Sequence, residues 1–578
     1  MICIMAFSLL ADAFAQSYDL PIVFIDTKGR CLSTNVRAKI PATIKVLNAK
    51  TNNVADSSKA TQYDIGIKVR GSLSRTFPKP NYSIEFHDST GKDINVSLFG
   101  LPPSDDWILL GPYVDKSMVR NSFGHWLFRQ TGRYSPRTKH FDLYINGGYR
   151  GVYVLVERIK RGKYRVDVNK LKETDTEGEN LTGGYIWTIE LNKRDKESFD
   201  ETEFEFSTSG GTNVTLRYPI TKKLANEQKE YLKNYLDDLE ALFKDGKNGN
   251  GYENYVDVAS TVDFLLLQEL AQNAKGYYSN VFMHKSKDKT DEHGNKIAGK
   301  ITLGPPGNFY LAFSNSNTPK NSNDDKNEAD SNWTIEQTYE AFNGSAGAIG
   351  YRLAEWPLEI WKDSVFQIEA SKRWAELRSG VWHTKVMDAY LDSMKTYLKN
   401  AADRNFKRWP NLGKASGQYD EDPEPIKYCP SSDRTTNPRV VIEYKADTWD
   451  GEFEYVRKTT KERIAWMDKQ FGFTEPENPV AFEPIIHEPD WRAEMGDKSE
   501  VYIHSDNFSR LSPTNYFAIN GNRLEVHTDI GGIFAIVDLN GAVLYKTRIK
   551  TGVTTLSIPA NARNKAWIAT LNSKMMNR

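Results

Sequence analysis

The sequence is poor in cysteine, has no excess of either charge and contains no long apolar run. Only three cysteines occur in 578 residues, so a disulfide-rich scaffold is excluded. Lysine plus arginine and aspartate plus glutamate both number 76, which argues against nucleic acid or an anionic membrane as the partner. Beyond the first residues, no stretch approaches the roughly 18 apolar residues of a membrane span. The chain is predicted to be globular, without a low-complexity tract or a membrane span.

The first residues and two of the three cysteines indicate where the protein is located in or outside the cell. The run MICIMAFSLLADAFAQS has an apolar stretch followed by Ala13-Phe14-Ala15, a small-x-small pattern typical of a signal-peptide cleavage site. A buried N-terminal helix is the alternative. We expect a secreted protein, located at the cell surface or outside the cell. There, Cys31 and Cys429 could form a disulfide, or both could remain free thiols, since nothing in their spacing indicates a pair.

Composition divides the chain into four parts. Residues 1–15 are the predicted signal peptide, and 16–475 form one long region of mixed texture. Residues 476–500 hold several prolines and mixed charges, which predicts a linker. Residues 501–578 contain short strand-like segments and an Asn-Gly hairpin turn. This last part is predicted to be a small β-sandwich.

The first half of the long region is β-rich. Apolar residues alternate with polar ones or glycine in two neighbouring segments, which predicts half-buried strands: Ile65, Ile67 and Val69, then Tyr82, Ile84 and Phe86. The loop between them, GSLSRTFPKP, combines glycine and hydroxyl residues with flanking cations. Such a loop could cradle a phosphate, because backbone N–H groups and cations both favour anions. It could equally be an ordinary hairpin connection.

A helix and a strand pair are predicted next. Asp115 is placed to cap a helix that ends at Gly132, and two alternating strands flank an Asn-Gly-Gly turn at 146–148. Glu157 ends the second of these strands, beside a basic run. Its carboxylate could pair with a phosphate-binding lysine or arginine, or it could be a solvated charge at the end of a strand.

The chain is predominantly helical from 258 to about 475. Within this part, residues 262–315 contain an apolar helix (VDFLLLQELAQN), a short strand, a polar turn and a second strand. This arrangement predicts that two polar loops, one around Lys275 and one around Asn308, lie side by side at an open edge.

Several blocks of this sequence, in order, resemble the CotH family of spore-coat-type atypical protein kinases. The blocks are VRGSLSRTFPKPNYSIEF, LFGLPPSDDWILLGPYVDKSMVRN, YINGGYRGVYVLVERIKR, TGGYIWTIE, RWAELR, FKRWPNLG and RIAWMDKQFG. The resemblance covers about residues 20–475. The final module, through VDLNGAVLYK, resembles the C-terminal sorting domains of type IX secretion cargo.

The resemblance implies an α+β, protein-kinase-like fold of atypical kind, with a β-rich N-terminal part and a helical C-terminal part. It implies transfer of the ATP γ-phosphate to a protein hydroxyl with a divalent metal such as magnesium. The residues placed at nucleotide-binding positions are Arg70, Lys79, Arg120 and Glu157.

The positions that carry the family's catalysis are altered in this chain. The family's catalytic aspartate aligns with Lys275, its metal-binding aspartate with Asn308 and a second polar position with Tyr310, whereas Asn280 keeps the spacing of a metal-holding asparagine. A protonated lysine cannot accept a proton and repels a metal ion, and an amide is a weaker ligand than a carboxylate. These substitutions predict a pseudokinase.

Three functions follow from these observations. The first is a secreted pseudokinase that acts as a nucleotide-binding or protein-binding scaffold, with an unknown protein partner at the cell surface. In it, Lys275 could contact nucleotide phosphates without a metal. The second is an active Ser/Thr kinase that uses other carboxylates, such as Glu157, Glu190 or Asp263, although Asp263 is also placed to cap a helix. The third is a polysaccharide-associated surface protein, suggested by the 12% aromatic content.

Overall fold

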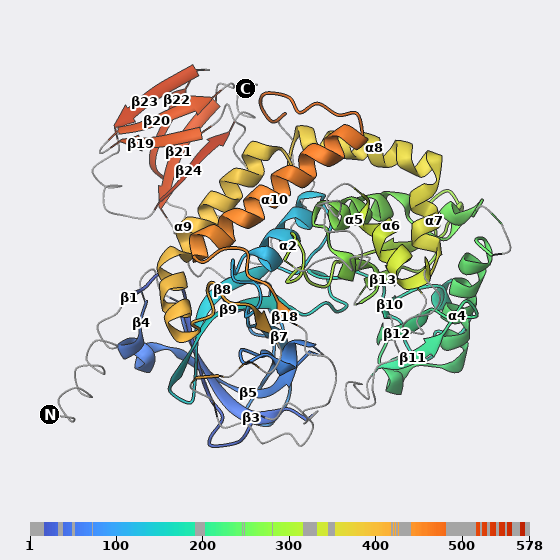
Figure 1. Cartoon of the computed structure of the whole chain (residues 1–578), viewed down its shortest axis with the longest axis horizontal. Coiled ribbons are helices and arrows are strands. Elements are labelled where there is room, and N and C mark those ends of the chain that lie inside the picture. The colour runs from blue at the N-terminus through green and yellow to red at the C-terminus, as the bar shows by residue number, and fades with distance from the viewer. Residues whose placement is uncertain are drawn as a thin grey trace. The chain divides into compact units, whose positions relative to one another are not determined.

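The computed structural model divides the chain into two compact units (Figure 1). The larger unit runs to residue 376 and resumes from 388 to 474, and the second comprises 377–387 and the chain from 475 onward. The structure describes residues 17–480, except 33–37, 49–51, 72, 191–202, 245–246, 248, 280, 316–331, 345–352, 418–419, 421, 424–425 and 427–440, and beyond 480 it describes six strands. The predicted signal peptide, Asn280, Cys429 and most of the predicted linker therefore lie outside the described residues.

The N-terminal strands close into a seven-stranded barrel. Its strands are β2 (Ile22–Asp26), β3 (Ile40–Leu47), β5 (Thr61–Arg70), β6 (Asn81–His87), β7 (Asp106–Leu110), β8 (Thr138–Ile145) and β9 (Gly148–Glu157). The order around the barrel is β2-β3-β5-β6-β7-β9-β8. Neighbours are antiparallel except β2 and β8, whose parallel pairing closes the ring.

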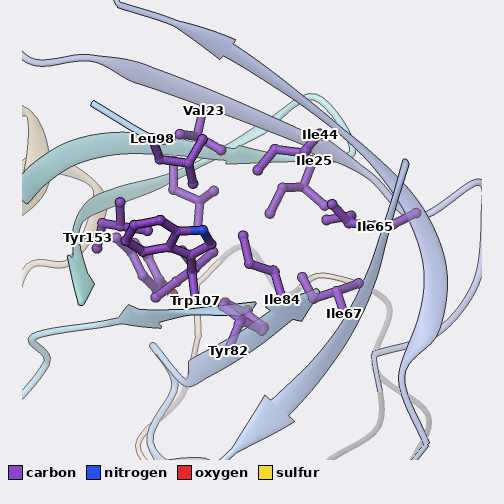
Figure 2. Packing of buried hydrophobic residues seen from close by; sticks show 14 of the residues in the cluster. Val23, Ile25, Ile44, Ile65, Ile67, Tyr82, Ile84, Leu98, Trp107 and Tyr153 are labelled. Atoms are coloured by element: carbon purple, nitrogen blue, oxygen red, sulfur yellow. The ribbon is translucent and has the colours of Figure 1, made fainter. Parts of the chain in front are cut away.

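The alternating residues of β5 and β6 point into the barrel, as their spacing predicts. Ile67, Tyr82, Ile84 and Phe86 have no exposed surface, and Ile65 is 2% exposed. Figure 2 shows how these strands and their neighbours fill the interior with Val23, Ile25, Ile44, Ile65, Ile67, Tyr82, Ile84, Leu98, Trp107 and Tyr153. Burial of so much apolar surface is the main stabilising contribution to this part of the fold.

A second, five-stranded antiparallel sheet supports the two polar loops. Its order is β11 (Phe204–Ser207), β12 (Asn213–Tyr218), β10 (Tyr185–Glu190), β13 (Val281–Lys285) and β16 (Ile301–Leu303). Strand β13 follows the Lys275 loop, and β16 precedes the Asn308 loop. Because β13 and β16 pair through Met283 and Leu303, the two loops belong to adjacent strands, as predicted.

Helices make up much of the rest of the described chain. The longer ones are α2 (Arg120–Gln130), α4 (Asn226–Ala241), α5 (Val258–Leu270), α8 (Ser364–Ser379), α9 (Thr384–Arg408) and α10 (Trp449–Gln470); shorter ones are α3 (Gly178–Leu181), α6 (Thr334–Tyr339) and α7 (Trp356–Lys362). The mixed content confirms the α+β class. None of the helices among the described residues is long and apolar enough to cross a membrane.

Two predicted helix starts differ from the structure. Helix α5 begins after Asp257, whose carboxylate accepts the amide of Ser260 at 2.7 Å, so the prediction that Asp263 caps a helix is wrong. Asp263 lies one turn and a half inside α5, buried, because Arg133 and Arg373 neutralise it. Helix α2 begins at Arg120, and Asp115 accepts the amide of that residue from five positions upstream.

The C-terminal part contains two three-stranded antiparallel sheets. One has the order β19 (Tyr516–Asn520), β20 (Arg523–Thr528) and β23 (Gly552–Ser557), and the other β22 (Val543–Ile549), β21 (Gly532–Asp538) and β24 (Trp567–Asn572) (Figure 1). The strands predicted there are present, the predicted Asn-Gly turn lies outside the described residues, and the β-sandwich stays a prediction.

Candidate functional site

Helix α5 and strand β13 position Lys275. The helix is mostly apolar, is buried from Ser260 onward and ends at Leu270. The chain then turns through Gln272, which has a positive φ of 47°, into the 3-10 helix η5 (Ala274–Tyr277). The amide of Asn273 donates to the carbonyl of Gln268 at 3.0 Å, which ties this turn to the end of α5. Lys275 therefore lies on a short, anchored turn.

The first turn of α2 positions the loop that contains Asn308. The side-chain oxygen of Asn121 accepts the amide of Phe309 at 2.8 Å. The guanidinium of Arg120 donates to the carbonyl of Ala312 at 3.2 Å and pairs with Asp115 at 2.8 Å. Arg120 has no exposed surface, so it contacts the loop from the protein interior.

Lys275 and Tyr310 join the two loops. The ammonium nitrogen of Lys275 lies 2.8 Å from the hydroxyl oxygen of Tyr310 and 5.1 Å from the centre of its ring. Burial opposes the positive charge of Lys275, but Tyr310, followed by Tyr278 and Glu190, outweighs it and raises the pKa of the ammonium above its usual value. Lys275 is therefore a cation at neutral pH.

Lys275 and Asn308 face the same small polar cavity. Its volume is about 10 Å³, and the described residues that line it are Phe264, Gln268, Asn273, Lys275, Gly276, Ser279, Gly307 and Asn308. None of these residues is a carboxylate. Asn273 bridges the two loops, because its amide donates to the carbonyl of Asn308 at 3.1 Å and to the side chain of Gln268 at 2.8 Å.

A buried carboxylate, that of Glu269, anchors the last residue of η5. Glu269 accepts the hydroxyl of Tyr277 at 2.6 Å, and it accepts the amides of Thr334 and Ile335, the first residues of α6, at 2.6 and 2.7 Å. It also pairs with Arg463 of α10 at 2.8 Å. One carboxylate therefore holds the Lys275 turn, α6 and α10 together.

Two of the residues predicted to bind nucleotide, Lys79 and Glu157, are buried and do not line this cavity. Lys79 is 1% exposed, and its ammonium donates to Asn405 of α9 at 2.7 Å. Burial and nearby arginines hold the pKa of Lys79 well below its usual value. Glu157 has no exposed surface and accepts two bonds from the guanidinium of Arg137, at 3.1 and 3.2 Å. Lys79 and Glu157 do not pair with each other.

The remaining predicted residues occupy separate places. Arg70 ends β5, where it pairs with Asn81 of β6. Glu190 ends β10 and pairs with Arg217 at 3.3 Å. Asp263 pairs with Arg133 at 2.7 Å and Arg373 at 2.8 Å. The structure thus brings Lys275 and Asn308 together, but it does not bring Glu157, Glu190 and Asp263 to one point.

The cavity does not fit a magnesium ion. Magnesium prefers carboxylate oxygens and water in an octahedral shell. Here the described lining offers amide oxygens and the partly buried ammonium of Lys275, which repels a dication. Among the described residues, the side chains that come close enough to share a metal are Glu85, His87 and Asp93 on the barrel, and Lys39 already pairs with Glu85 there.

Sequence reasoning missed Gln268, Asn273 and Glu269. All three lie at or just after the end of an apolar helix, where polar residues are usually read as the helix boundary. The signal that could have found Glu269 is its place among buried leucines, since a lone carboxylate in such a helix needs a partner.

Comparison with known families decides the relationship. A family model described as CotH kinase protein matches residues 67–467, more than half of the chain. The chain belongs to the CotH kinase family. No curated protein matches it. The CotH match runs from the last residues of β5 through the later barrel strands, both polar loops and nearly all of α10, so Lys275 and Asn308 lie inside the family domain.

Proposed function

We propose that this CotH-family protein is a pseudokinase, exported to the cell surface or beyond, that binds a protein partner and does not transfer phosphate through magnesium. The observation that carries the proposal is the pairing of Lys275 with Tyr310 beside Asn308. A partly buried cation fixed at the position that aligns with the catalytic aspartate disfavours both a bound dication and proton acceptance.

The surroundings of this pair support the proposal. Each candidate substitute carboxylate already has an arginine partner: Glu157 has Arg137, Glu190 has Arg217, and Asp263 has Arg133 and Arg373. Releasing any of them to hold a metal would break an ion pair with a partly buried guanidinium, which is costly.

The retained fold supports a binding role. The Asn121 and Arg120 contacts still hold the Asn308 loop, and Glu269 still holds the Lys275 turn. A scaffold needs this rigidity without the chemistry. Surface binding to polysaccharide gains no support, because six tryptophans are among the largest fully buried side chains and cannot stack on sugars: Trp107, Trp187, Trp356, Trp361, Trp374 and Trp382.

Incubation of the purified mature protein with labelled ATP tests the proposal. Magnesium or manganese is supplied together with acidic and basic protein acceptors, and we expect no incorporation of label. Incorporation that is lost in a folded Glu190→Gln variant would overturn the proposal in favour of an active kinase. Recovery of one specific surface protein with the wild-type chain, without label transfer, is the result the scaffold role predicts.

A further inference from the structure

We propose that the cavity beside Lys275 binds an anionic group about one atom across, namely a halide ion or one oxygen of a phosphoryl group. The site would then have the opposite polarity to a metal site. This inference deepens the proposed function, because it gives the altered site a ligand class, and it rests on the cavity itself.

The charge around the cavity favours an anion. Lys275 is the one titratable residue among the described residues that line it. The carboxylates closest to this turn have other cations: Glu190 pairs with Arg217 at 3.3 Å, and Glu269 pairs with Arg463 at 2.8 Å. A partly buried ammonium that donates to the hydroxyl of Tyr310 gains from a nearby negative charge.

Besides Lys275, a neutral donor that lacks a partner among the described residues lines the same cavity. Gln268 has no exposed surface, and its side-chain oxygen accepts from Asn273 at 2.8 Å. Its amide nitrogen has no hydrogen-bond partner among the described residues. A buried N–H group without a partner costs about 1–3 kcal/mol, so such groups usually mark a bound water or ion. The cavity thus combines a cation with an unused neutral donor.

The size of the cavity limits the ligand. A volume of about 10 Å³ corresponds to roughly one water molecule. It cannot be enlarged from the side of η5, because the turn packs directly on Gln268. A Cβ atom added at Gly276 would lie 2.2 Å from the Gln268 side-chain oxygen. A halide, or a single oxygen of a larger anion, matches this space, whereas a whole phosphate does not.

Chloride line broadening in ³⁵Cl NMR, measured on the full mature chain with gluconate holding ionic strength constant, tests the proposal. We expect saturable broadening in the wild type. Gln268→Glu keeps the shape of the side chain but adds negative charge, and it should lower chloride affinity about tenfold or more, equivalent to about 1.4 kcal/mol. Lys275→Met should abolish the broadening, and Lys275→Arg should retain part of it. The matched control is Lys289→Met, since Lys289 is exposed on β14 (Lys289–Thr290) and should leave the broadening unchanged.

Competition separates the two sources of the anion. If adding ADP without magnesium removes the saturable line broadening, the ligand is a phosphoryl oxygen. If the broadening persists, the ligand is a halide. Equal broadening in the wild type and a folded Gln268→Glu variant would overturn the inference, as would a wild type that shows no saturable broadening, because the cavity would then hold water only. Label transfer from ATP would refute the proposed pseudokinase and leave these chloride results unaffected.

Discussion

The ammonium of Lys275 and the hydroxyl of Tyr310 lie 2.8 Å apart, although 35 positions separate them in the sequence. Their hydrogen bond links the turn after α5 to the loop after β16. In an active metal-dependent kinase, these two loops are joined through a metal ion and its phosphate ligands. Here a lysine and a tyrosine make the connection directly, so the two loops are held without a ligand.

Removing the Tyr310 hydroxyl should weaken this connection. We expect Tyr310→Phe to lower the free energy of unfolding by about 1 kcal/mol, because one hydrogen bond to a partly buried charge is lost while the ring remains. Urea unfolding measures the change. If Tyr310→Phe costs as much in a Lys275→Met background as in the wild type, the two side chains are not coupled.

Glu269 should be the most sensitive position near the site. Glu269→Gln leaves Arg463 buried without its countercharge, and we expect a loss of about 3–5 kcal/mol in the free energy of unfolding. The matched double variant, Glu269→Gln with Arg463→Met, should recover part of this loss because no unpaired charge remains. A single variant as stable as the wild type would show that the pair does not hold the turn.

The fold should lose stability in mild acid. Burial lowers the pKa of His140 from 6.5 to about 4, although its bond to the Met118 carbonyl opposes the shift. The unfolded chain therefore binds more protons between these values, and stability falls as pH drops from 6.5 to 4. Each unit of difference between the folded and unfolded pKa corresponds to about 1.4 kcal/mol, so His140 should contribute about 3 kcal/mol to the loss in the free energy of unfolding.

Thermal unfolding as a function of pH measures this contribution. His140→Gln can still donate to the Met118 carbonyl and does not titrate, so its stability should fall less steeply between pH 6.5 and 4. His284 and His125 also have pKa values lowered by burial, to about 4 and about 3, and the remaining slope should come partly from them. Identical slopes in the wild type and His140→Gln would contradict the buried, neutral state of His140.

Local sequence patterns predicted much of this fold. The alternation in β5 and β6, the buried helix before Lys275 and the pairing of the two strands beyond it all follow from periodicity, which is a local property. The juxtaposition of Lys275 and Asn308 was predictable for the same reason, since each loop directly adjoins one strand of that pair.

Long-range contacts could not be predicted in this way. The barrel closes because Ile22–Ile25 pair with Asp142–Ile145, and no local pattern specifies that partner. Lys79 belongs to a loop that could cradle a phosphate, yet its ammonium is buried against Asn405, which is 326 positions away. Glu157 likewise has its arginine partner on another segment. In both cases the partner of a charged side chain is set by tertiary packing, which the local sequence does not specify.

Magnesium binding tests the central claim most directly. Isothermal titration of the wild-type protein with magnesium chloride, with sodium chloride as the reference, should show no specific heat, because Asn308 supplies an amide at the metal-binding position and Lys275 places a cation beside it. The variant carrying both Lys275→Asp and Asn308→Asp should bind magnesium saturably, and Asn308→Asp alone should not, since Lys275 would still repel the ion. Saturable magnesium binding by the wild type, unchanged in the double variant, would contradict the account.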